Sequence, residues 1–261
     1  MLGTFAALGY FARDPIASFL GERLLARRGV ACDSLALNIS WDLSRVAVGP
    51  TTCRLEHGRV AELGLPSGGE VRLAWLRPRA LDADVLRVVP RELPEDIEFA
   101  GPGMLGDELA RAPMERGFSV AAGFAERVDR IDLRVGRLEL VRDERGLVVT
   151  DVVVRRTDEG LYLEVEKIEP RGGALRRGPV EVHWHVGSLV GRVAPHDVDV
   201  RGRLRLDATL AGLGRRGDLG FAVRGRDLNG LNPPNLTISW EDTAEIRSLR
   251  DIAQRLRDAL R

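Results

Sequence analysis

Signature motifs of catalysis are missing from this 261-residue chain. It has no H-E-x-x-H zinc motif, no G-x-S-x-G nucleophile turn, no phosphate-binding P-loop and no C-x-x-C pair. Its many carboxylates lie in strongly charged, alternating contexts, which are typical of a solvated face. Because no set of residues specifies a reaction, we predict a protein that is not an enzyme and uses no cofactor.

Net charge is also missing. The chain has 39 basic and 39 acidic residues, so no overall field attracts nucleic acid, and we expect no nucleic-acid partner. Lys167 is the single lysine, and every other basic residue apart from the histidines is an arginine. This bias indicates a GC-rich genome and a bacterial source.

Long apolar runs are absent. The weakly polar stretch at residues 1–12 ends at Arg13, whereas a helix that crosses a bilayer needs roughly 20 apolar residues. Neither a basic segment before this stretch nor a small-x-small cleavage site after it is present, so residues 1–12 do not form a standard secretory signal. We expect a periplasmic or envelope-associated protein if an export signal lies upstream, and a cytoplasmic protein otherwise.

Cysteine is scarce, with Cys32 and Cys53 as the whole set. If residues 32–41 and 44–53 form a hairpin that turns at residues 41–44, Cys32 lies opposite Cys53. Side chains directly opposed across antiparallel strands have Cβ atoms about 4.5–5.5 Å apart, close to what a disulfide tolerates. One interpretation is therefore a disulfide, which requires an oxidising compartment. The other is a pair of unrelated small hydrophobic residues.

Aromatic residues make up only 5% of the chain, and Leu and Val fill most apolar positions. These recur at every second position in short runs such as Leu35 to Trp41, Val71 to Trp75 and Ile131 to Val135. A period of two indicates half-buried β-strands, and the clusters of Gly, Asp and Arg between the runs indicate turns. We predict a mainly β fold, either a long curved antiparallel sheet or an open barrel with a groove. After Val135 the apolar positions change from odd to even, which predicts a β-bulge.

Helix patterns occur at the two ends. Near the N-terminus, Asp14 is the expected N-cap, Pro15 the first helical residue and Gly29 the stop. Near the C-terminus, Asp242 and Glu245 form a capping box before an apolar stripe within residues 242–261. We expect both amphipathic helices to cover the sheet, and a membrane surface or a protein partner is the alternative contact of the C-terminal helix. The apolar face of the N-terminal helix consists of Ile16, Phe19, Leu20 and Leu24.

One segment fits a dinucleotide-binding pattern. Gly101, Gly103 and Gly106 have G-x-G-x-x-G spacing, but that fingerprint needs a buried apolar strand before it and a helix that accepts phosphate after it. Here three carboxylates precede the glycines, and Asp107 and Glu108 repel phosphate. We interpret residues 96–116 as a loop in a single β-rich domain over 1–261, joining lobes 1–95 and 117–261.

Two histidines, His183 and His185, alternate with Trp184 and share one face of an expected strand. A metal ion needs a third and usually a fourth ligand, and the sequence does not fix Glu181 or His196 in those positions. We interpret the pair as solvent-facing histidines opposite a core tryptophan, and we predict no metal site.

The N-terminal helix followed by C-D-S-L-A-L-N-I-S-W, G-R-V-A-E-L-G-L-P and E-V-R-L-A-W-L-R-P resembles the start of bacterial envelope proteins of the AsmA and TamB type. The later G-R-L-E-L, G-L-Y-L-E-V-E-K-I and G-R-L-R-L strands resemble the LmeA-like proteins, which have a tubular lipid-binding fold. The resemblance implies an apolar concave face for acyl chains and a role in lipid transport or outer-membrane homeostasis.

A curved sheet with an apolar inner face is filled by its own side chains, covered by helices or occupied by a ligand. We predict lipid or another apolar ligand, and the alternative is a sandwich with a dry core. The alternative function is a structural or assembly subunit of an envelope or secretion complex that acts through strand edges or the C-terminal helix. The candidate ligand-binding residues are Trp41, Leu73, Trp75, Leu133, Leu163 and Trp184.

Overall fold

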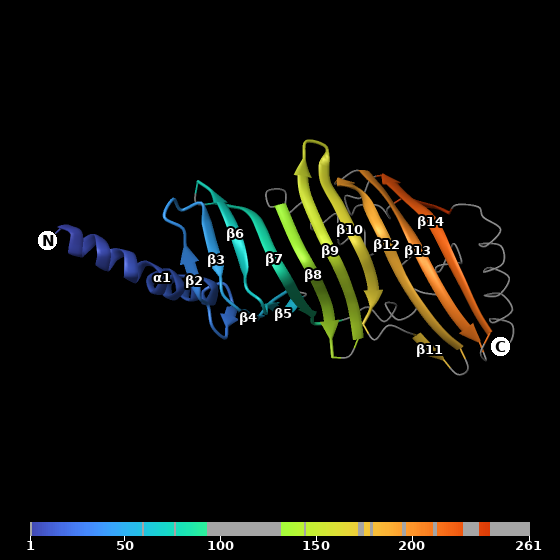
Figure 1. Cartoon of the computed structure of the whole chain (residues 1–261), viewed down its shortest axis with the longest axis horizontal. Coiled ribbons are helices and arrows are strands. Elements are labelled where there is room, and N and C mark those ends of the chain that lie inside the picture. Colours follow the sequence, from blue (N-terminus) through green and yellow to red (C-terminus); the bar gives the residue numbers. More distant parts are fainter. Residues whose placement is uncertain are drawn as a thin grey trace.

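The computed structural model describes residues 2–58, 60–75, 77–92, 132–143, 145–171, 175–177, 180–194, 197–210, 213–226 and 235–240. In these residues one helix, α1 (Leu2–Ala26), precedes a 15-stranded sheet (Figure 1). The strands are β1 (Val30–Cys32), β2 (Leu37–Ile39), β3 (Arg45–Val48), β4 (Thr51–Leu55), β5 (Val60–Leu65), β6 (Gly69–Ala74), β7 (Arg77–Pro90), β8 (Asp132–Arg142), β9 (Arg145–Thr157), β10 (Gly160–Pro170), β11 (Leu175–Arg177), β12 (Val180–Ala194), β13 (Asp197–Leu210), β14 (Leu213–Arg226) and β15 (Asn235–Trp240). The glycine-rich segment and the expected C-terminal helix lie outside the described residues, so they and the two lobes stay predictions.

Helix α1 begins earlier than the sequence predicts. Asp14, the expected N-cap, and Pro15 both lie inside the helix. The Asp14 carboxylate is turned toward the sheet, where Oδ1 accepts the Ile39 N–H at 3.2 Å and Oδ2 accepts the Asn38 amide at 3.2 Å. The C-terminal end agrees with the prediction, because Gly29 has a φ of 73° and its N–H donates to the Ala26 carbonyl at 3.1 Å.

The predicted apolar face of α1 does not cover the sheet. The contact is made by Ser18, whose Oγ accepts the Leu37 N–H at 2.9 Å, and by Glu22, whose Oε1 accepts the Leu35 N–H at 3.2 Å. Between them Gly21 brings the helix so close that a Cβ there would lie 3.0 Å from Leu35 Cδ2. The prediction of coverage is therefore wrong, because the helix approaches the sheet through small and hydrogen-bonding side chains. The apolar stripe is exposed at Ile16 (54%), Phe19 (58%), Leu20 (51%) and Leu24 (62%).

The strands form one open sheet whose main path is β1-β4-β5-β7-β8-β9-β10-β12-β13-β14-β15 (Figure 1). The mainly β class is confirmed, but the purely antiparallel arrangement is wrong. β7 and β8 run parallel, with Ala83 beside Val135, while every other pair of described strands is antiparallel. β8 therefore begins at the same end of the sheet as β7.

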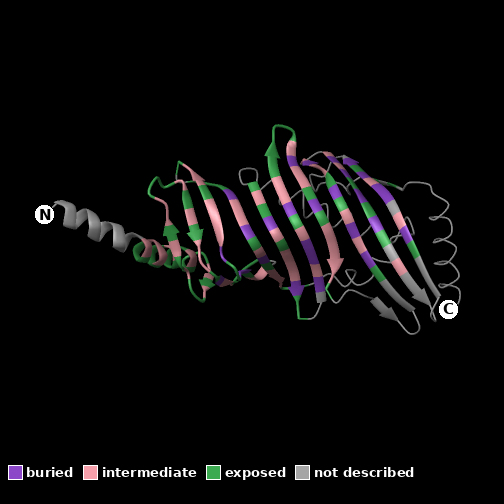
Figure 2. Ribbon diagram, viewed as in Figure 1, coloured by how far each residue is buried: buried purple, intermediate pink, exposed green. Residues whose placement is uncertain are grey.

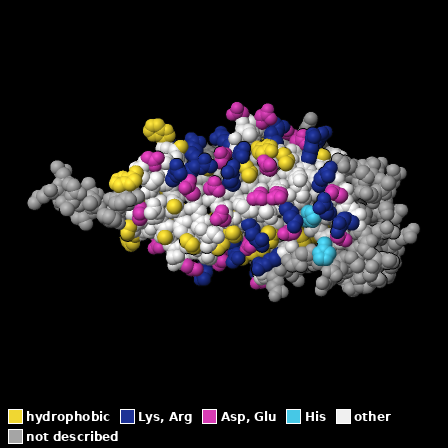
Figure 3. All heavy atoms as spheres, in the orientation of Figure 1, with side chains coloured by type: hydrophobic (Ala, Val, Ile, Leu, Met, Phe, Trp, Pro, Cys, Tyr) yellow, Lys and Arg dark blue, Asp and Glu magenta, His cyan; other side chains and the backbone are white. Residues whose placement is uncertain are grey.

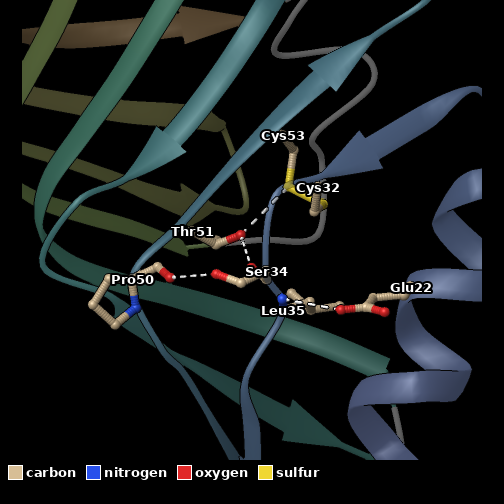
Figure 4. The surroundings of a disulfide bond; sticks show 7 residues. All are labelled: Glu22, Cys32, Ser34, Leu35, Pro50, Thr51 and Cys53. Carbon is tan, nitrogen blue, oxygen red and sulfur yellow. Dashed lines mark hydrogen bonds between the residues drawn. A yellow bond between two sulfur atoms is a disulfide. The ribbon is translucent and has the colours of Figure 1, made fainter.

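On its other edge, β7 carries two short arms. Its first half pairs with β6, which continues to β3 and β2, and its second half pairs with β5, which continues to β4 and β1. In the second arm Cys32 of β1 lies opposite Cys53 of β4, and a disulfide joins them (Figure 4). Leu37 of β2 pairs with Val48 of β3, and this pair and the cysteine pair are centred on the same turn at residues 41–44. The two cysteines therefore lie opposite each other, as the sequence predicts.

Side chains alternate between two faces of the sheet, as the bands of burial along each strand show (Figure 2). The apolar face carries the core, in which Val135, Val198, Val200 and Val223 have no exposed surface. The opposite face, here the charged face, carries cross-strand ion pairs, and both signs of charge are mixed over the strands in Figure 3. Period-two patterning therefore reports the two faces correctly.

The alternation changes phase at one level in five neighbouring strands, a line that we call the crease. In β8 the apolar face is reached by Val135 before Gly136 and by Leu138 after it, as the change of parity in the sequence predicts. The registers of β8 with β7 and β9 stay continuous, so the prediction of a bulge in β8 is wrong. The alternation changes phase in the neighbouring strands at the same level as in β8. The equivalent pairs are Ala83 and Leu86 in β7, Val152 and Val149 in β9, Val165 and Ile168 in β10, and Leu189 and Val186 in β12.

The crease ends between β12 and β13. Gly187 pairs with Arg203 and Val190 with Arg201, so β12 contains one residue more than β13 over this interval. Ser188 takes a φ of 51° in this bulge. On β13 the alternation runs unbroken through Val198, Val200 and Leu204, so the bulge absorbs the change of phase.

Candidate functional site

The apolar face contains a cross-strand line of residues in register, which we call the apolar line. It crosses eight strands, and at a strand spacing of about 4.8 Å its seven intervals span about 34 Å. Its members are Leu81, Leu133, Val154, Leu163, Gly191, Val200, Val223 and Ile238. Its members from Leu81 to Leu163 are half-buried, whereas Val200 and Val223 are fully buried.

Three of the six predicted ligand-binding residues lie on the apolar face. Leu133 and Leu163 are both members of the apolar line, where each pairs with Val154 of β9, and both are half-buried against the core. Trp184 is 5% exposed and belongs to the same core beside Leu206 of β13. The sequence therefore placed these three side chains on one surface.

Trp41 and Trp75 lie elsewhere. Each occupies a turn, with 74% and 96% of its surface exposed, because the turns that join β2 to β3 and β6 to β7 take these residues out of the alternating strands. Trp75 has a φ of 53°, a turn conformation. Leu73, half-buried at the end of β6, links the two turns, since its N–H donates to the Ser44 carbonyl at 2.7 Å. The structure thus separates these three from the apolar line.

The turn that carries Trp41 is held by Asp42. Its carboxylate accepts the Ser40 hydroxyl at 2.7 Å, the Ser44 hydroxyl at 2.7 Å and the Ser44 N–H at 3.1 Å. These hydrogen bonds favour the ionised form and lower the pKa of Asp42 to about 2. Trp41 is therefore presented on an ordered turn.

Gly191 is the one residue of the apolar line without a side chain, and the backbone of β13 explains why. A Cβ at this position would lie 2.3 Å from the Asp199 carbonyl oxygen and 2.5 Å from the Val200 Cα. Only glycine permits this approach of β12 to β13.

On the charged face, two carboxylates meet at the crease. Glu166 of β10 is hydrogen-bonded to Asp151 of β9, and this bond, with the repulsion between the two groups, raises the pKa of Glu166 above its ordinary value. Asp151 has a φ of 48°. No local feature of the sequence pairs these residues, since they meet only through the register of β9 and β10.

Glu166→Gln is expected to alter the pH dependence of stability. The stability that protonated Glu166 contributes is present below the ordinary glutamate pKa and is lost as pH rises through the raised pKa. The melting temperature of the variant relative to wild type should therefore increase from pH 4 to pH 7, as scanning calorimetry can measure. Glu164→Gln, an exposed site on the same strand, serves as the control. A difference that does not change with pH contradicts the assignment.

The histidines of β12 lie on the charged face. His183 is exposed and His185 half-buried, while Trp184 between them is buried on the other side. Burial, with the nearby Lys167 and Arg205, lowers the pKa of His185. Among the described residues, no group of three or more His, Cys, Asp or Glu side chains is placed to hold a metal ion.

Comparison with protein-family models, with curated proteins and with solved structures found no match for this chain. Within the part of the chain that the structure describes, no helix combines the length and the hydropathy that crossing a bilayer requires.

Proposed function

We propose that the protein is a non-enzymatic lipid-binding or apolar-ligand-binding protein of the bacterial envelope, with a role in lipid transport. The observation that carries the proposal is the half-buried part of the apolar line, from Leu81 in β7 to Leu163 in β10. In this proposal the sheet curves around the line, and the ligand lies along the resulting groove. Each Å² of apolar surface that a ligand covers contributes about 25 cal/mol, so a surface of this length favours an extended hydrocarbon chain.

The contacts of the described elements support this use of the apolar face. Extensive contacts join neighbouring strands, and the main contacts of α1 are with β1 and β2 at one end of the sheet. The line is half-buried from Leu81 to Leu163, so this part of it retains apolar surface that a ligand can cover. Leu133 and Leu163, which are half-buried at its centre, are the proposed ligand contacts together with Trp184.

The disulfide supports the proposed location. Bonds of this kind persist in oxidising compartments such as the bacterial periplasm and are rare in the cytosol. Cys32 and Cys53 are the only cysteines of the chain. The likeness of the strand sequences to AsmA, TamB and LmeA-like envelope proteins supports the same location and the same class of ligand.

Native mass spectrometry of the purified protein tests the proposal. A phospholipid that co-purifies in a defined stoichiometry supports it, and mass analysis of the released molecule identifies the ligand. A preparation that holds no lipid and acquires none from phospholipid micelles contradicts it.

Leu163→Gln is expected to reduce the lipid-bound fraction about tenfold, because an amide on the apolar line loses its hydrogen bonds to water when the ligand covers it. Tyr162→Gln is the matched control, since Tyr162 is the preceding residue on β10 and lies on the charged face beside Arg155 and Arg192. Circular dichroism checks that both variants fold. Equal lipid binding by the two variants contradicts a site on the apolar face.

A second candidate is a structural or assembly subunit of an envelope or secretion complex. The observations that favour it are the exposed apolar stripe of α1 and the exposed side chains of Trp41 and Trp75. Large exposed apolar patches are typical of interaction surfaces. In the same mass spectra, a defined oligomer without lipid favours this second function.

A further inference from the structure

The charged face has a depression of about 650 Å³ at the bulge where the crease ends. Its polar side chains are three arginines, Arg201 and Arg203 of β13 and Arg224 of β14, together with the hydroxyls of Ser188 and Ser239. We call this the arginine pocket. No carboxylate lines it, so its lining is strongly basic on a chain whose net charge is zero.

Several arginines elsewhere on this face are paired with acids. Arg205 lies 2.9 Å from Asp218, Arg216 lies 3.1 Å from Asp207, and Arg192 lies 2.6 Å from Asp197. Opposite charges at cross-strand positions are the usual arrangement on a solvated sheet face. The arginine pocket departs from this arrangement.

The strand register explains the departure. Arg203 has Gly187 on one side and Gly220 on the other. Glycines in both neighbouring strands offer Arg203 neither a counter-charge nor a side chain that would fill the space. The extra residue of β12 then turns Ser188 toward the same space, in a left-handed conformation that is uncommon for serine.

Asp199 lies at the border of the pocket and orients two of the arginines. Its Oδ1 is 3.8 Å from Nε of Arg201 and 3.9 Å from Nε of Arg224, distances that exceed a hydrogen bond. The same oxygen is buried and has no hydrogen-bond partner. The carboxylate therefore attracts both guanidinium groups without occupying their terminal N–H donors, which stay free to bind a ligand.

We propose that the arginine pocket binds a phosphate group, either free or as the phosphate of an ester. Guanidinium groups match phosphate oxygens with pairs of parallel N–H donors, and serine hydroxyls add single donors. Three arginines against one carboxylate leave an excess of positive charge that suits a phosphate of one or two negative charges. This site lies on the opposite face from the apolar line and does not depend on the proposed lipid function.

Arg203→Gln is the test variant, because Arg203 lies between two glycines and has no ion pair within the described residues. Arg216→Gln is the matched control: it removes one charge from the same face, but from an arginine that is paired with Asp207 outside the pocket. Binding of inorganic phosphate is measured by titration calorimetry. We expect Arg203→Gln to weaken it by about tenfold or more and Arg216→Gln to change it by less than about twofold.

Two further probes distinguish the source of the phosphate. Glycerol 3-phosphate represents soluble esters, and phosphatidylglycerol vesicles, with phosphatidylcholine vesicles as reference, represent lipid headgroups. If Arg203→Gln weakens binding of the vesicles as well as of inorganic phosphate, the pocket recognises headgroups, and if only the soluble probes respond, it recognises a soluble phosphate. Absence of saturable phosphate binding by the wild-type protein, or equal weakening by the two variants, overturns the proposal.

Discussion

Gly191→Ala is expected to destabilise the protein by about 3 kcal/mol, at the upper end of what forced overpacking costs. The added Cβ meets backbone atoms of β13, the nearest being the Asp199 carbonyl oxygen at 2.3 Å. Backbone cannot rotate away as a flexible side chain can, so relief requires β12 and β13 to separate along the apolar line. Their hydrogen bonds and the packing of Val200 are then weakened together.

Urea denaturation followed by circular dichroism measures this change in the free energy of unfolding. Gly64→Ala is the control, because Gly64 is also a strand glycine, but the nearest atoms to an added Cβ are 3.6 Å away. We expect that variant to differ from wild type by less than about 1 kcal/mol, since alanine also restricts the unfolded chain. Similar losses for both variants contradict the argument from close approach.

Removal of the disulfide, by Cys32→Ala with Cys53→Ala, is expected to destabilise the second arm of the sheet, which contains β1 and β4, by about 3 kcal/mol. The bond closes a loop with a sequence separation of 21 residues, and a loop of this size loses about that much conformational freedom in the unfolded chain. The arm has little else to compensate, because β1 has three residues and pairs only with β4. Beside the bond, Thr51 donates its hydroxyl to the Ser34 carbonyl (Figure 4).

Hydrogen exchange followed by mass spectrometry locates the effect. Amides of β1 and β4 should exchange faster in the double variant, while those of β13 and β14, at the far end of the main path, should be unchanged. Reduction of the wild-type protein with dithiothreitol should reproduce the pattern. Unchanged exchange in β1 and β4 contradicts a stabilising role for the bond.

Features of the fold that depend on local patterns were predictable from the sequence. The alternation of Leu133 and Val135 with charged residues defined a strand and its two faces, and the change of parity after Val135 marked the crease. The meeting of Cys32 with Cys53 needed only the midpoint of one turn. In each case the information lies within about 20 residues of the chain.

Features that depend on distant pairing were not predictable. The parallel junction of β7 and β8 is set by how the chain returns after Pro90, and no residue of either strand encodes it. Amphipathicity showed that α1 has an apolar stripe at Phe19 and Leu20, but not that Ser18 and Gly21 face the sheet. Periodicity alone does not show which face of a helix contacts the sheet.

The candidate sites divide in the same way. Leu133, Leu163 and Trp184 followed from the period of two, whereas Trp41 and Trp75 continue that period in the sequence but occupy turns. The arginine pocket was missed because Arg203 is distinguished by its neighbours Gly187 and Gly220 in adjacent strands. The signal becomes visible only when the register of β12, β13 and β14 is known.

The parallel junction also has a consequence for the order in which the protein folds. Strands that follow each other in the sequence, such as β8 and β9 or β13 and β14, can pair soon after they leave the ribosome because few residues separate them. β7 can pair with β8 only after the chain has been synthesised beyond Asp132, where β8 begins. Closure of this long loop carries an entropic cost that no hairpin in the sheet carries. We therefore expect docking of β7 onto β8 to be the slow event in assembly of the sheet.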